Sequence, residues 1–211
     1  MTLADIRREY LGQALDESRA EADPFRQFTF WFDQVRQLEV DPTAMALATA
    51  TRDGRPSVRT VLLKAVDPRG FVFFTNYRSR KAREIEESGR ASALFFWQSV
   101  ERQVRVNGTV EQVSGEESDA YFATRPLDSR LSVYASRQSE VLDSRATLDA
   151  RFETTRHAYP DGHVPRPPWW GGYRLIPDEF EFWQGRENRL HDRLQYRLGA
   201  DGIWIRERLA P

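Results

Sequence analysis

The chain has 211 residues, of which 40% are hydrophobic and 30% charged, and its formal net charge is −1. This length and composition suit one globular domain over residues 1–211 with helical additions. It contains no cysteine, which excludes disulfides, thiol nucleophiles and cysteine-based metal sites, and its three histidines lack metal-ligand spacing, so we expect no bound metal. The balanced charge argues against nucleic-acid binding. The N-terminal residues lack an apolar signal core, and no apolar run approaches ~18 residues, so we expect no membrane binding. Together these features predict a cytoplasmic protein.

The N-terminal segment, up to about residue 40, is predicted to be helical, with a short helix over residues 6–15 and a longer helix that begins at Asp23-Pro24. In that pair, a residue type that caps helices precedes a proline, which is favoured at the first helical position. Apolar side chains then recur at helical spacing and predict one buried stripe: Phe25, Phe28, Trp31, Phe32, Val35 and Leu38. We expect Asp41-Pro42 to end this helix.

Between Thr43 and about Val113 the pattern changes to β-strands joined by short turns. Strands are predicted over residues 44–51, 57–66, 71–75, 91–97 and 103–113. Asp53-Gly54 marks a hairpin between the first two strands, and Ser79 is expected to cap a helix that interrupts the series. This succession favours an antiparallel barrel or sandwich.

A helical insertion is predicted over about residues 114–160. Ser114 followed by Glu117 matches a capping box and begins a helix that runs toward Arg125-Pro126. A further helix over 144–159 and a proline-rich loop over 160–168 follow. The last strands are expected to complete the same sheet, over 173–176, 179–183, 190–198 and 203–208. The predicted fold class is therefore mainly β with flanking helices (α+β).

Two basic groups lie within the predicted strands and the helix that follows them. Arg59 and Lys64 would lie on opposite faces of a regular strand, unless a bulge brings them together. Residues 75–81 lead from a strand into a helix N-terminus, where backbone N–H groups, the helix dipole and the cations Arg80 and Lys81 favour a phosphate. The alternative for this second group is an ordinary solvated helix start.

A third group lies on the predicted insertion. Tyr121 and Arg125 are four residues apart, hence on one helix face, and with Ser129 they offer a phenol, a guanidinium and a hydroxyl suited to one phosphate. The alternative is a core tyrosine beside a surface arginine.

The segment 189–193 is the most informative stretch of the chain. If it forms a strand, Arg189, His191 and Arg193 share one face, and Leu190 takes the other face with Leu194. Two guanidiniums around an imidazole suit phosphates and electron-rich rings. The partner strand is predicted over 179–185, with Phe180 and Phe182 inward and Trp183 on the opposite face. An edge strand with a solvated basic face is the alternative.

Several well-known motifs are missing from the sequence. It has no G-x-G-x-x-G and no G-x-x-x-x-G-K, which argues against Rossmann and P-loop nucleotide binding. It also has no G-x-S-x-G nucleophile elbow. What remains is a set of basic groups on a predominantly β scaffold.

These groups, in this order, resemble the pyridoxine/pyridoxamine 5′-phosphate oxidase family over nearly the whole chain. The matching blocks are Arg7 to Tyr10, Asp41 to Met45, Arg59 to Lys64, Phe74 to Asn76, Ser79 to Lys81, Glu101 to Val104, Tyr121-Phe122, Arg125-Pro126, Gln138-Ser139, Trp170 to Gly172, Glu181 to Gly185, Arg189 to Arg193 and Arg208 to Pro211. So many ordered blocks make the resemblance far more specific than any single motif.

The resemblance implies an FMN-binding split antiparallel β-barrel, Greek-key-like, in a homodimer with two FMN sites at the subunit interface. It implies oxidation of pyridoxine 5′-phosphate or pyridoxamine 5′-phosphate to pyridoxal 5′-phosphate. The flavin would carry the redox chemistry, with O2 as electron acceptor, hydrogen peroxide as product and ammonia released from the amine.

The resemblance also implies roles for residues at matching positions. FMN would be held by Arg59, Thr60, Val61, Leu62, Leu63, Lys64, Phe74, Thr75, Arg80 and Lys81, and further by Gln103, Gln138, Ser139, Trp183 and Arg193. The substrate phosphate would be held by Lys64, Tyr121, Arg125 and Ser129. Arg189 and His191 would lie over the pyridine ring of the substrate and would be the catalytic residues. Leu190, between them, would also contact the substrate. A flap over the substrate would be formed by Arg7, Arg8, Glu9 and Tyr10, and Asp41 would lie near the site.

Two departures and two alternatives stay open at this stage. Some relatives have tyrosine where Phe74 stands, and residues 130–133 differ from the run common among relatives. The first alternative is a related FMN-dependent oxidase of phenazine biosynthesis, which the presence of the substrate-phosphate residues argues against. The second is a non-catalytic protein that binds flavin or pyridoxal phosphate. The sequence does not indicate a preference between amine and alcohol substrates.

Overall fold

A computed structural model describes residues 9, 10 and 12–211. Arg7 and Arg8, and part of the short helix predicted over 6–15, lie outside the described residues. For the described residues of that segment the prediction is wrong, since they form no regular secondary structure. The backbone N–H of Leu15 donates to the Asp192 carboxylate at 3.1 Å, and the Leu15 side chain is buried. Contacts with the distant C-terminal part of the chain therefore replace local helical hydrogen bonds here.

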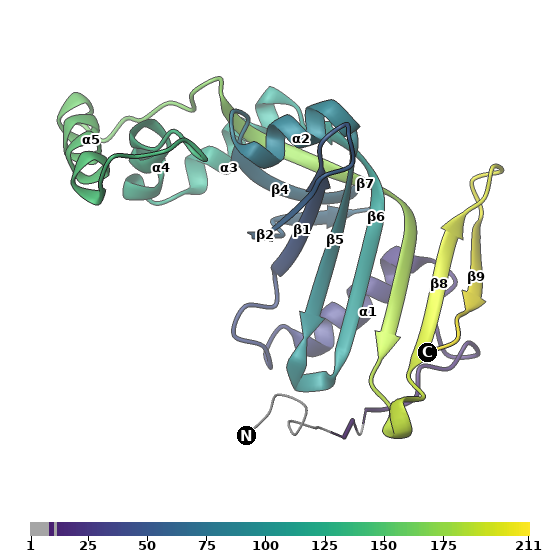
Figure 1. The fold of residues 1–211 in the computed structure, drawn as a ribbon. Helices are drawn as coiled ribbons and strands as arrows, with labels where there is room; N and C mark the ends of the chain where they lie inside the picture. Colours follow the sequence, from purple (N-terminus) through teal and green to yellow (C-terminus); the bar gives the residue numbers. More distant parts are fainter. Residues whose placement is uncertain (1–8, 11) are drawn as a thin grey trace.

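The described residues contain one nine-stranded antiparallel sheet that curls into a half-barrel (Figure 1). The strand order is β2-β1-β5-β6-β7-β4-β3, and β8 pairs with both β7 and β9. The strands are β1 (Ala44–Ala50), β2 (Pro56–Leu62), β3 (Ala65–Asp67), β4 (Gly70–Asn76), β5 (Arg90–Trp97), β6 (Arg102–Gln112), β7 (Trp170–Gln184), β8 (Asp192–Leu198) and β9 (Trp204–Arg208). The mainly β fold class predicted from the sequence is confirmed.

Five α-helices accompany the sheet in the described part of the chain: α1 (Pro24–Val35), α2 (Arg80–Ser88), α3 (Gly115–Thr124), α4 (Leu127–Ala135) and α5 (Arg145–Ala158). The three predicted caps are confirmed, because the side chains of Asp23, Ser79 and Ser114 each accept a backbone N–H in the first turn of α1, α2 and α3. None of the helices described is long and apolar enough to cross a membrane.

Helix α1 closes the main core by packing its apolar stripe against the sheet (Figure 1). Phe28, Trp31 and Val35 are buried there among aromatic side chains of the strands, as the helical spacing predicts. Leu38 is 60% exposed, so its assignment to this stripe is wrong. The helix ends at Val35 rather than at Asp41-Pro42, and the residues beyond it no longer follow the helical period.

Two predicted strand boundaries are wrong. The strand expected over 57–66 is broken after Leu62, where the N–H of Leu63 donates to Thr43 and that of Lys64 donates to Val72. The strands expected over 173–176 and 179–183 are instead one continuous strand, β7. A register shift between Asn107 and Gly108 leaves Asp178 without a partner on β6, directly after Pro177, which has no N–H for the ladder. Such register shifts depend on the partner strand and are therefore hard to predict from the sequence of one strand.

The predicted insertion forms an arm that projects from one end of the sheet (Figure 1). The helix predicted to run toward Arg125-Pro126 does end there, as α3, but the sequence analysis gave no bounds for α4, which begins directly after Pro126. A second, smaller core lies beneath the arm and contains Phe122, Leu131, Val133, Val164 and Trp170. The arm therefore has a fixed base on β7, at the end of the sheet that carries the cavity described next.

Candidate cofactor and substrate site

A cavity of about 940 Å³ lies between the outer strands, the N-terminus of α2 and the base of the arm. Its walls contain most of the residues predicted to hold the cofactor or the substrate phosphate: Arg59, Thr60, Val61, Leu62, Lys64, Phe74, Thr75, Arg80, Lys81, Tyr121, Arg125, Gln138 and Ser139. The break after β2 lets Arg59 and Lys64 line the same cavity, which a regular strand would prevent. Leu63 is buried in the main core, and neither it nor Ser129 lines this cavity.

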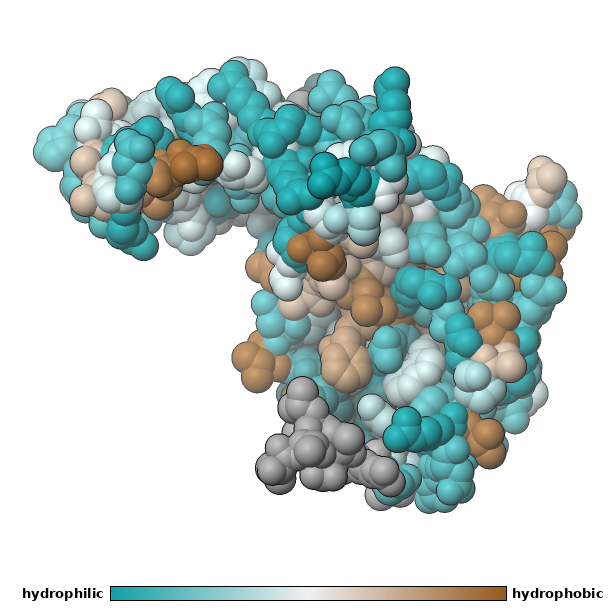
Figure 2. Space-filling model, viewed as in Figure 1, coloured by the Kyte–Doolittle hydropathy of each residue, from teal (hydrophilic) through white to brown (hydrophobic). Residues whose placement is uncertain are grey.

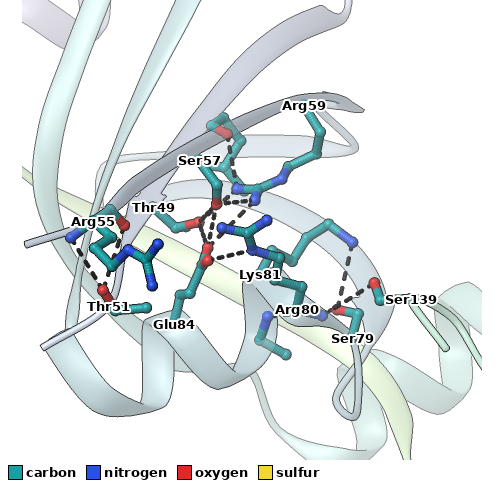
Figure 3. Close-up of polar contacts among 12 residues, drawn as sticks. Thr49, Thr51, Arg55, Ser57, Arg59, Ser79, Arg80, Lys81, Glu84 and Ser139 are labelled. Carbon is teal, nitrogen blue, oxygen red and sulfur yellow. Dashed lines mark hydrogen bonds and ion pairs between the residues drawn. The ribbon is translucent and has the colours of Figure 1, made fainter. Parts of the chain in front are cut away.

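Arg59 is anchored beneath the cavity by protein acceptors (Figure 3). Its Nη1 donates to the Leu47 carbonyl at 3.1 Å and to Thr49 Oγ1 at 2.5 Å. Its Nη2 donates to Ser57 Oγ and to Glu84 Oε2, the latter at 3.3 Å. Arg59 is therefore a fixed positive charge with few donors left for a ligand.

Lys81 lies deeper, at the start of α2, and its side chain is buried. Its Nζ donates to neutral groups: Thr75 Oγ1 at 3.0 Å, Gln138 Oε1 at 3.3 Å and Ser79 Oγ at 3.4 Å. Burial, with a smaller contribution from the positive charge of Arg59, lowers the pKa of Lys81 to about 8. A buried ammonium with no carboxylate partner among the described residues is what an anion-binding site requires.

Arg80 occupies the first position of α2, and its side chain is 58% exposed, against 22% for Arg59. Its backbone N–H donates to Ser139 Oγ at 3.1 Å, which joins the helix N-terminus to the loop after α4. Its Nε donates to Glu84 Oε1 at 2.7 Å, while no partner of its Nη atoms is found in the described part of the chain. The N-terminus of α2 thus presents backbone dipoles and a guanidinium to the cavity.

The opposite wall combines stacked aromatic rings with Arg125. The rings of Phe74 and Tyr121 stack with centroids 3.9 Å apart, and Phe74 stacks on Trp170 at 5.6 Å. The Arg125 guanidinium lies over the Trp170 ring at 4.7 Å, and its buried Nη1 has no hydrogen-bond partner among the residues that the structure describes. Burial lowers the pKa of Arg125 and raises that of Tyr121. An unpaired buried guanidinium nitrogen again fits a bound anion.

A second group of predicted residues lies on the outward face of β6, β7 and β8. Gln103 pairs in register with Trp183, and Trp183 pairs with Arg193, so the three form one row across adjacent strands. Phe180 and Phe182 point into the core, as predicted, and Trp183 lies on the other face. None of the three residues in the row lines the cavity of their own chain.

Arg193 is held in this row by Glu181, which the sequence analysis did not single out. The Arg193 Nε and Nη2 donate to the two oxygens of the buried Glu181 carboxylate at 2.9 and 3.1 Å. Arg105 Nη2 donates to the same carboxylate at 2.7 Å. The hydrogen bond with Glu181 raises the pKa of Arg193. Alternation along the strand places Glu181 on the face of Trp183, which is the only local signal for its role.

The prediction that residues 189–193 form a strand is wrong for the first three of them. Arg189 lies in a short 3-10 turn, Glu187–Arg189, with a φ of 62°, and β8 begins only at Asp192. Leu190 is 69% exposed whereas Leu194 is fully buried, so they do not share a face. The turn satisfies its own polar groups: Leu190 N–H donates to the Glu187 carbonyl at 3.1 Å.

His191 is oriented by this turn and by the N-terminal segment. The backbone N–H of Arg186 donates to His191 Nδ1 at 3.1 Å, so a neutral imidazole carries its proton on Nε2. The His191 ring lies 4.6 Å from the Trp183 ring, and Tyr10 contacts both, at 5.4 and 5.7 Å. Tyr10 of the expected flap is therefore close to His191, while Glu9 is exposed and Arg7 and Arg8 lie outside the described residues.

The structure thus assembles the predicted residues into two groups in one chain. The first lines the cavity, and the second is the row on β6, β7 and β8 together with the turn that carries Arg189 and His191. The sequence analysis assigned no role to several cavity residues, among them Ser57, Ser132 and Ser136. It also missed the buried Glu84, although its spacing of four from Arg80 on a helix is a signal for an ion pair.

Comparison with known proteins identifies the family. Residues 32–159 match the family model of pyridoxamine 5′-phosphate oxidase, and residues 170–211 match the C-terminal dimerisation region of pyridoxine 5′-phosphate oxidase. A pyridoxine/pyridoxamine 5′-phosphate oxidase of Rubrobacter xylanophilus is 56% identical over 210 residues, 99% of this chain and 96% of that relative. The chain belongs to the pyridoxine/pyridoxamine 5′-phosphate oxidase family. A second member, from Trichormus variabilis, is 51% identical over 100% of this chain and 99% of its own length.

Solved structures confirm the predicted split-barrel fold. PhzG from Burkholderia lata, crystallised with tetrahydrophenazine-1-carboxylic acid, superposes with a TM-score of 0.88 at 33% identity, covering 95% of this chain and 99% of that one. A pyridoxamine 5′-phosphate oxidase-related, FMN-binding protein from Nostoc punctiforme has a TM-score of 0.72 at 19% identity, covering 94% of this chain and 100% of its own. At that identity the second structure supports the fold alone.

Proposed function

We propose that this family member is an FMN-dependent oxidase that converts pyridoxine 5′-phosphate and pyridoxamine 5′-phosphate to pyridoxal 5′-phosphate. Electrons would pass to O2, with hydrogen peroxide as product and ammonia released from the amine substrate. The observation that carries the proposal is a cavity with two separate cationic subsites. Lys81 marks the first and Arg125 the second, and no carboxylate pairs with either among the described residues. Two anion subsites fit one phosphorylated cofactor and one phosphorylated substrate.

The first subsite fits the phosphate of FMN. Lys81, Arg80 and the N-terminus of α2 would hold it, with Arg59 as a fixed charge beneath. Gln138 and Thr75, which already bond each other and Lys81, would continue the polar wall toward the flavin. When bound, the flavin would accept a hydride from the substrate and pass the electrons to O2. The chain's own residues would bind, orient and shield the flavin and the substrate.

The second subsite fits the substrate phosphate. Arg125 offers a buried donor, and Lys64 and Tyr121 line the same cavity. The Phe74–Tyr121–Trp170 stack fixes the position of this wall. Arg189 and His191 would meet the pyridine ring: the guanidinium would stabilise electron density on the ring, and His191 Nε2 would donate a hydrogen bond.

The division of predicted residues between two places supports a homodimer with shared sites. Arg189, His191, Trp183 and Arg193 would complete the cavity of the partner subunit. The segment 170–211 that carries them matches a dimerisation region. The outward face of the sheet also exposes large apolar side chains, with Val58 67%, Phe96 51% and Leu62 37% exposed. Figure 2 shows apolar atoms gathered over β1, β2 and β5, beneath the arm. A second copy of the chain would cover this face.

A phenazine-type oxidase is the second candidate, because the PhzG structure superposes closely on this chain. Two observations favour vitamin B6 phosphates instead. The ligand in that structure is a carboxylic acid, whereas the present cavity contains Lys64, Tyr121 and Arg125 beside the subsite for the cofactor phosphate. Identity to pyridoxine/pyridoxamine 5′-phosphate oxidases is also higher, at 56% against 33%.

The proposed function is tested by oxygen uptake with each vitamin B6 phosphate, with and without added FMN. We expect uptake with both phosphates, dependence on FMN, and one hydrogen peroxide per turnover. Unphosphorylated pyridoxine serves as the control and should be oxidised far more slowly. Protein that binds flavin but consumes no oxygen would indicate a non-catalytic binding protein. Oxidation of a reduced phenazine carboxylate, but of neither phosphate, would favour the second candidate.

A further inference from the structure

We propose that Glu84 is a positioning residue that holds Arg59 and Arg80 in the arrangement that binds the cofactor phosphate. The inference rests on the proposed function, because it assumes that the first subsite takes the phosphate of FMN. Glu84 lies on α2, one helical turn after Arg80, and is buried behind the cations rather than in the cavity wall.

The two carboxylate oxygens of Glu84 accept hydrogen bonds from different groups (Figure 3). Oε2 accepts hydrogen bonds from Thr49 Oγ1 at 2.5 Å, from Ser57 Oγ, and from Arg59 Nη2 at 3.3 Å. Oε1 accepts from Arg80 Nε at 2.7 Å. One oxygen is thus anchored on β1 and β2, and the other holds the guanidinium at the start of α2.

The contacts of Arg80 show how this arrangement serves an anion. Glu84 engages only the Nε of Arg80, and the side chain stays 58% exposed where it lines the cavity. Its Nη atoms, which have no partner in the described part of the chain, remain for a phosphate. An arginine without this inner contact would sample many rotamers, because its long side chain has several rotatable bonds.

Electrostatics gives a second reason for a carboxylate at this place. Arg59, Arg80 and Lys81 lie close together, and the charge of Arg59 already contributes to the lowered pKa of Lys81. Burying Glu84 raises its pKa, but hydrogen bonds from Ser57, Thr49 and Arg80 outweigh burial and lower it to about 2. The carboxylate therefore stays ionised and offsets the repulsion among the cations. A buried ion pair often adds little to the stability of the folded protein, so a role in cofactor binding explains the buried Glu84 better than a role in folding.

The test compares FMN with riboflavin, which has the same ring system and ribityl chain but no phosphate. Dissociation constants are measured by quenching of flavin fluorescence for the wild type, Glu84→Gln and the control Glu86→Gln, which changes an exposed carboxylate on the same helix. We expect Glu84→Gln to weaken FMN binding about ten- to hundredfold and to leave riboflavin binding within about twofold. The control should change neither constant.

A double-mutant cycle with Arg80→Met shows whether Glu84 acts through Arg80. We expect Glu84→Gln to weaken FMN binding much less in the Arg80→Met background than in the wild type. Equal loss of FMN and riboflavin would reveal a purely structural role and overturn the inference. So would an unchanged or increased preference for FMN in Glu84→Gln. If the wild type itself binds FMN no more tightly than riboflavin, the proposed function fails first, and the inference falls with it.

Discussion

At the scale of single residues, Lys81 and Arg59 are two cations of one subsite that are held in different ways. The Arg59 guanidinium donates to a carboxylate and to several other acceptors, whereas the partners of Lys81 in the described part of the chain are all neutral. Burial therefore disfavours the charged form of Lys81. The subsite thus contains one cation whose charge can be lost at moderately alkaline pH.

FMN affinity should fall above pH 8 because Lys81 loses its proton there. The pKa of Lys81 is lowered to about 8, first by burial and then by Arg59, so the ammonium is charged below pH 8 and progressively neutral above it. A phosphate monoester is a dianion above about pH 6 and prefers the charged form. We expect the dissociation constant for FMN to rise by only about twofold between pH 7 and 8, and then by up to about tenfold per pH unit. Lys81→Met should bind weakly with a flat profile, and a flat wild-type profile up to pH 9.5 would contradict the assignment.

The two cationic subsites should be separable by mutation. Arg125→Ala is expected to weaken binding of pyridoxine 5′-phosphate and to leave FMN affinity nearly intact, whereas Lys81→Ala should do the reverse. Loss of a charged hydrogen-bond partner typically costs ~1.5–3 kcal/mol, about ten- to hundredfold in affinity. Flavin titration and the KM for the substrate measure the two effects. Equal effects of both variants on both ligands would refute this division.

At the scale of elements, the base of the arm is clamped to the sheet by one buried arginine. Arg174 on β7 has a side chain only 3% exposed and donates to Glu117 on α3 at 3.0 and 3.2 Å and to Asp67 at 3.1 Å. Helix α3 carries Tyr121 and ends at Arg125, so this clamp also fixes the wall of the second subsite.

Glu117→Ala should destabilise the protein by about 1–3 kcal/mol, because it removes one of the two carboxylates that compensate a buried guanidinium. Glu116→Ala is the matched control: Glu116 lies in the same first turn and loses the same helix-dipole contribution, but has no ion pair in the described part of the chain. Urea unfolding of both variants measures the difference. Equal destabilisation by the two substitutions would assign the effect to the helix terminus rather than to Arg174.

At the scale of the whole molecule, the proposed site would be complete only when two chains combine. One chain would supply the cavity, and its partner would supply the turn with Arg189 and His191. Arg189→Met should keep FMN bound and lose at least about tenfold in catalytic efficiency, equivalent to ~1.4 kcal/mol of transition-state stabilisation.

Mixed dimers should recover activity lost in both parents. Arg125→Ala impairs the cavity and Arg189→Met impairs the turn. In a mixed dimer with shared sites, one site carries both changes and the other carries neither. Subunits mixed at equal concentrations should then regain about a quarter of wild-type activity, since about half of the dimers are mixed. Tagged co-expression and oxygen uptake measure this. Mixed dimers no more active than their parents would indicate that each site lies within one chain.

The sequence alone determined the features that depend on neighbouring residues. The caps at Asp23, Ser79 and Ser114, the apolar stripe of α1 and most strands were predictable because N-caps and hydrophobic periods act within a few positions. The ordered motifs also sufficed to recognise the family and the fold. The basic residues that line the cavity could be named as groups, though not placed relative to one another.

Only the tertiary structure decided what depends on partners distant in the chain. The break after β2 is fixed by hydrogen bonds to Thr43 and Val72, and the continuity of β7 by a register shift against β6. The strand expected through Arg189 became a turn, closed by Arg186 N–H and His191 Nδ1. The inner role of Glu84 follows from hydroxyl groups on two other elements. Strand pairing and buried polar contacts join residues that are far apart in the sequence, so a local sequence pattern does not predict them. The physical reason is that each buried hydrogen-bonding group must be paired, and its partner is determined by which residues lie nearby in the folded chain.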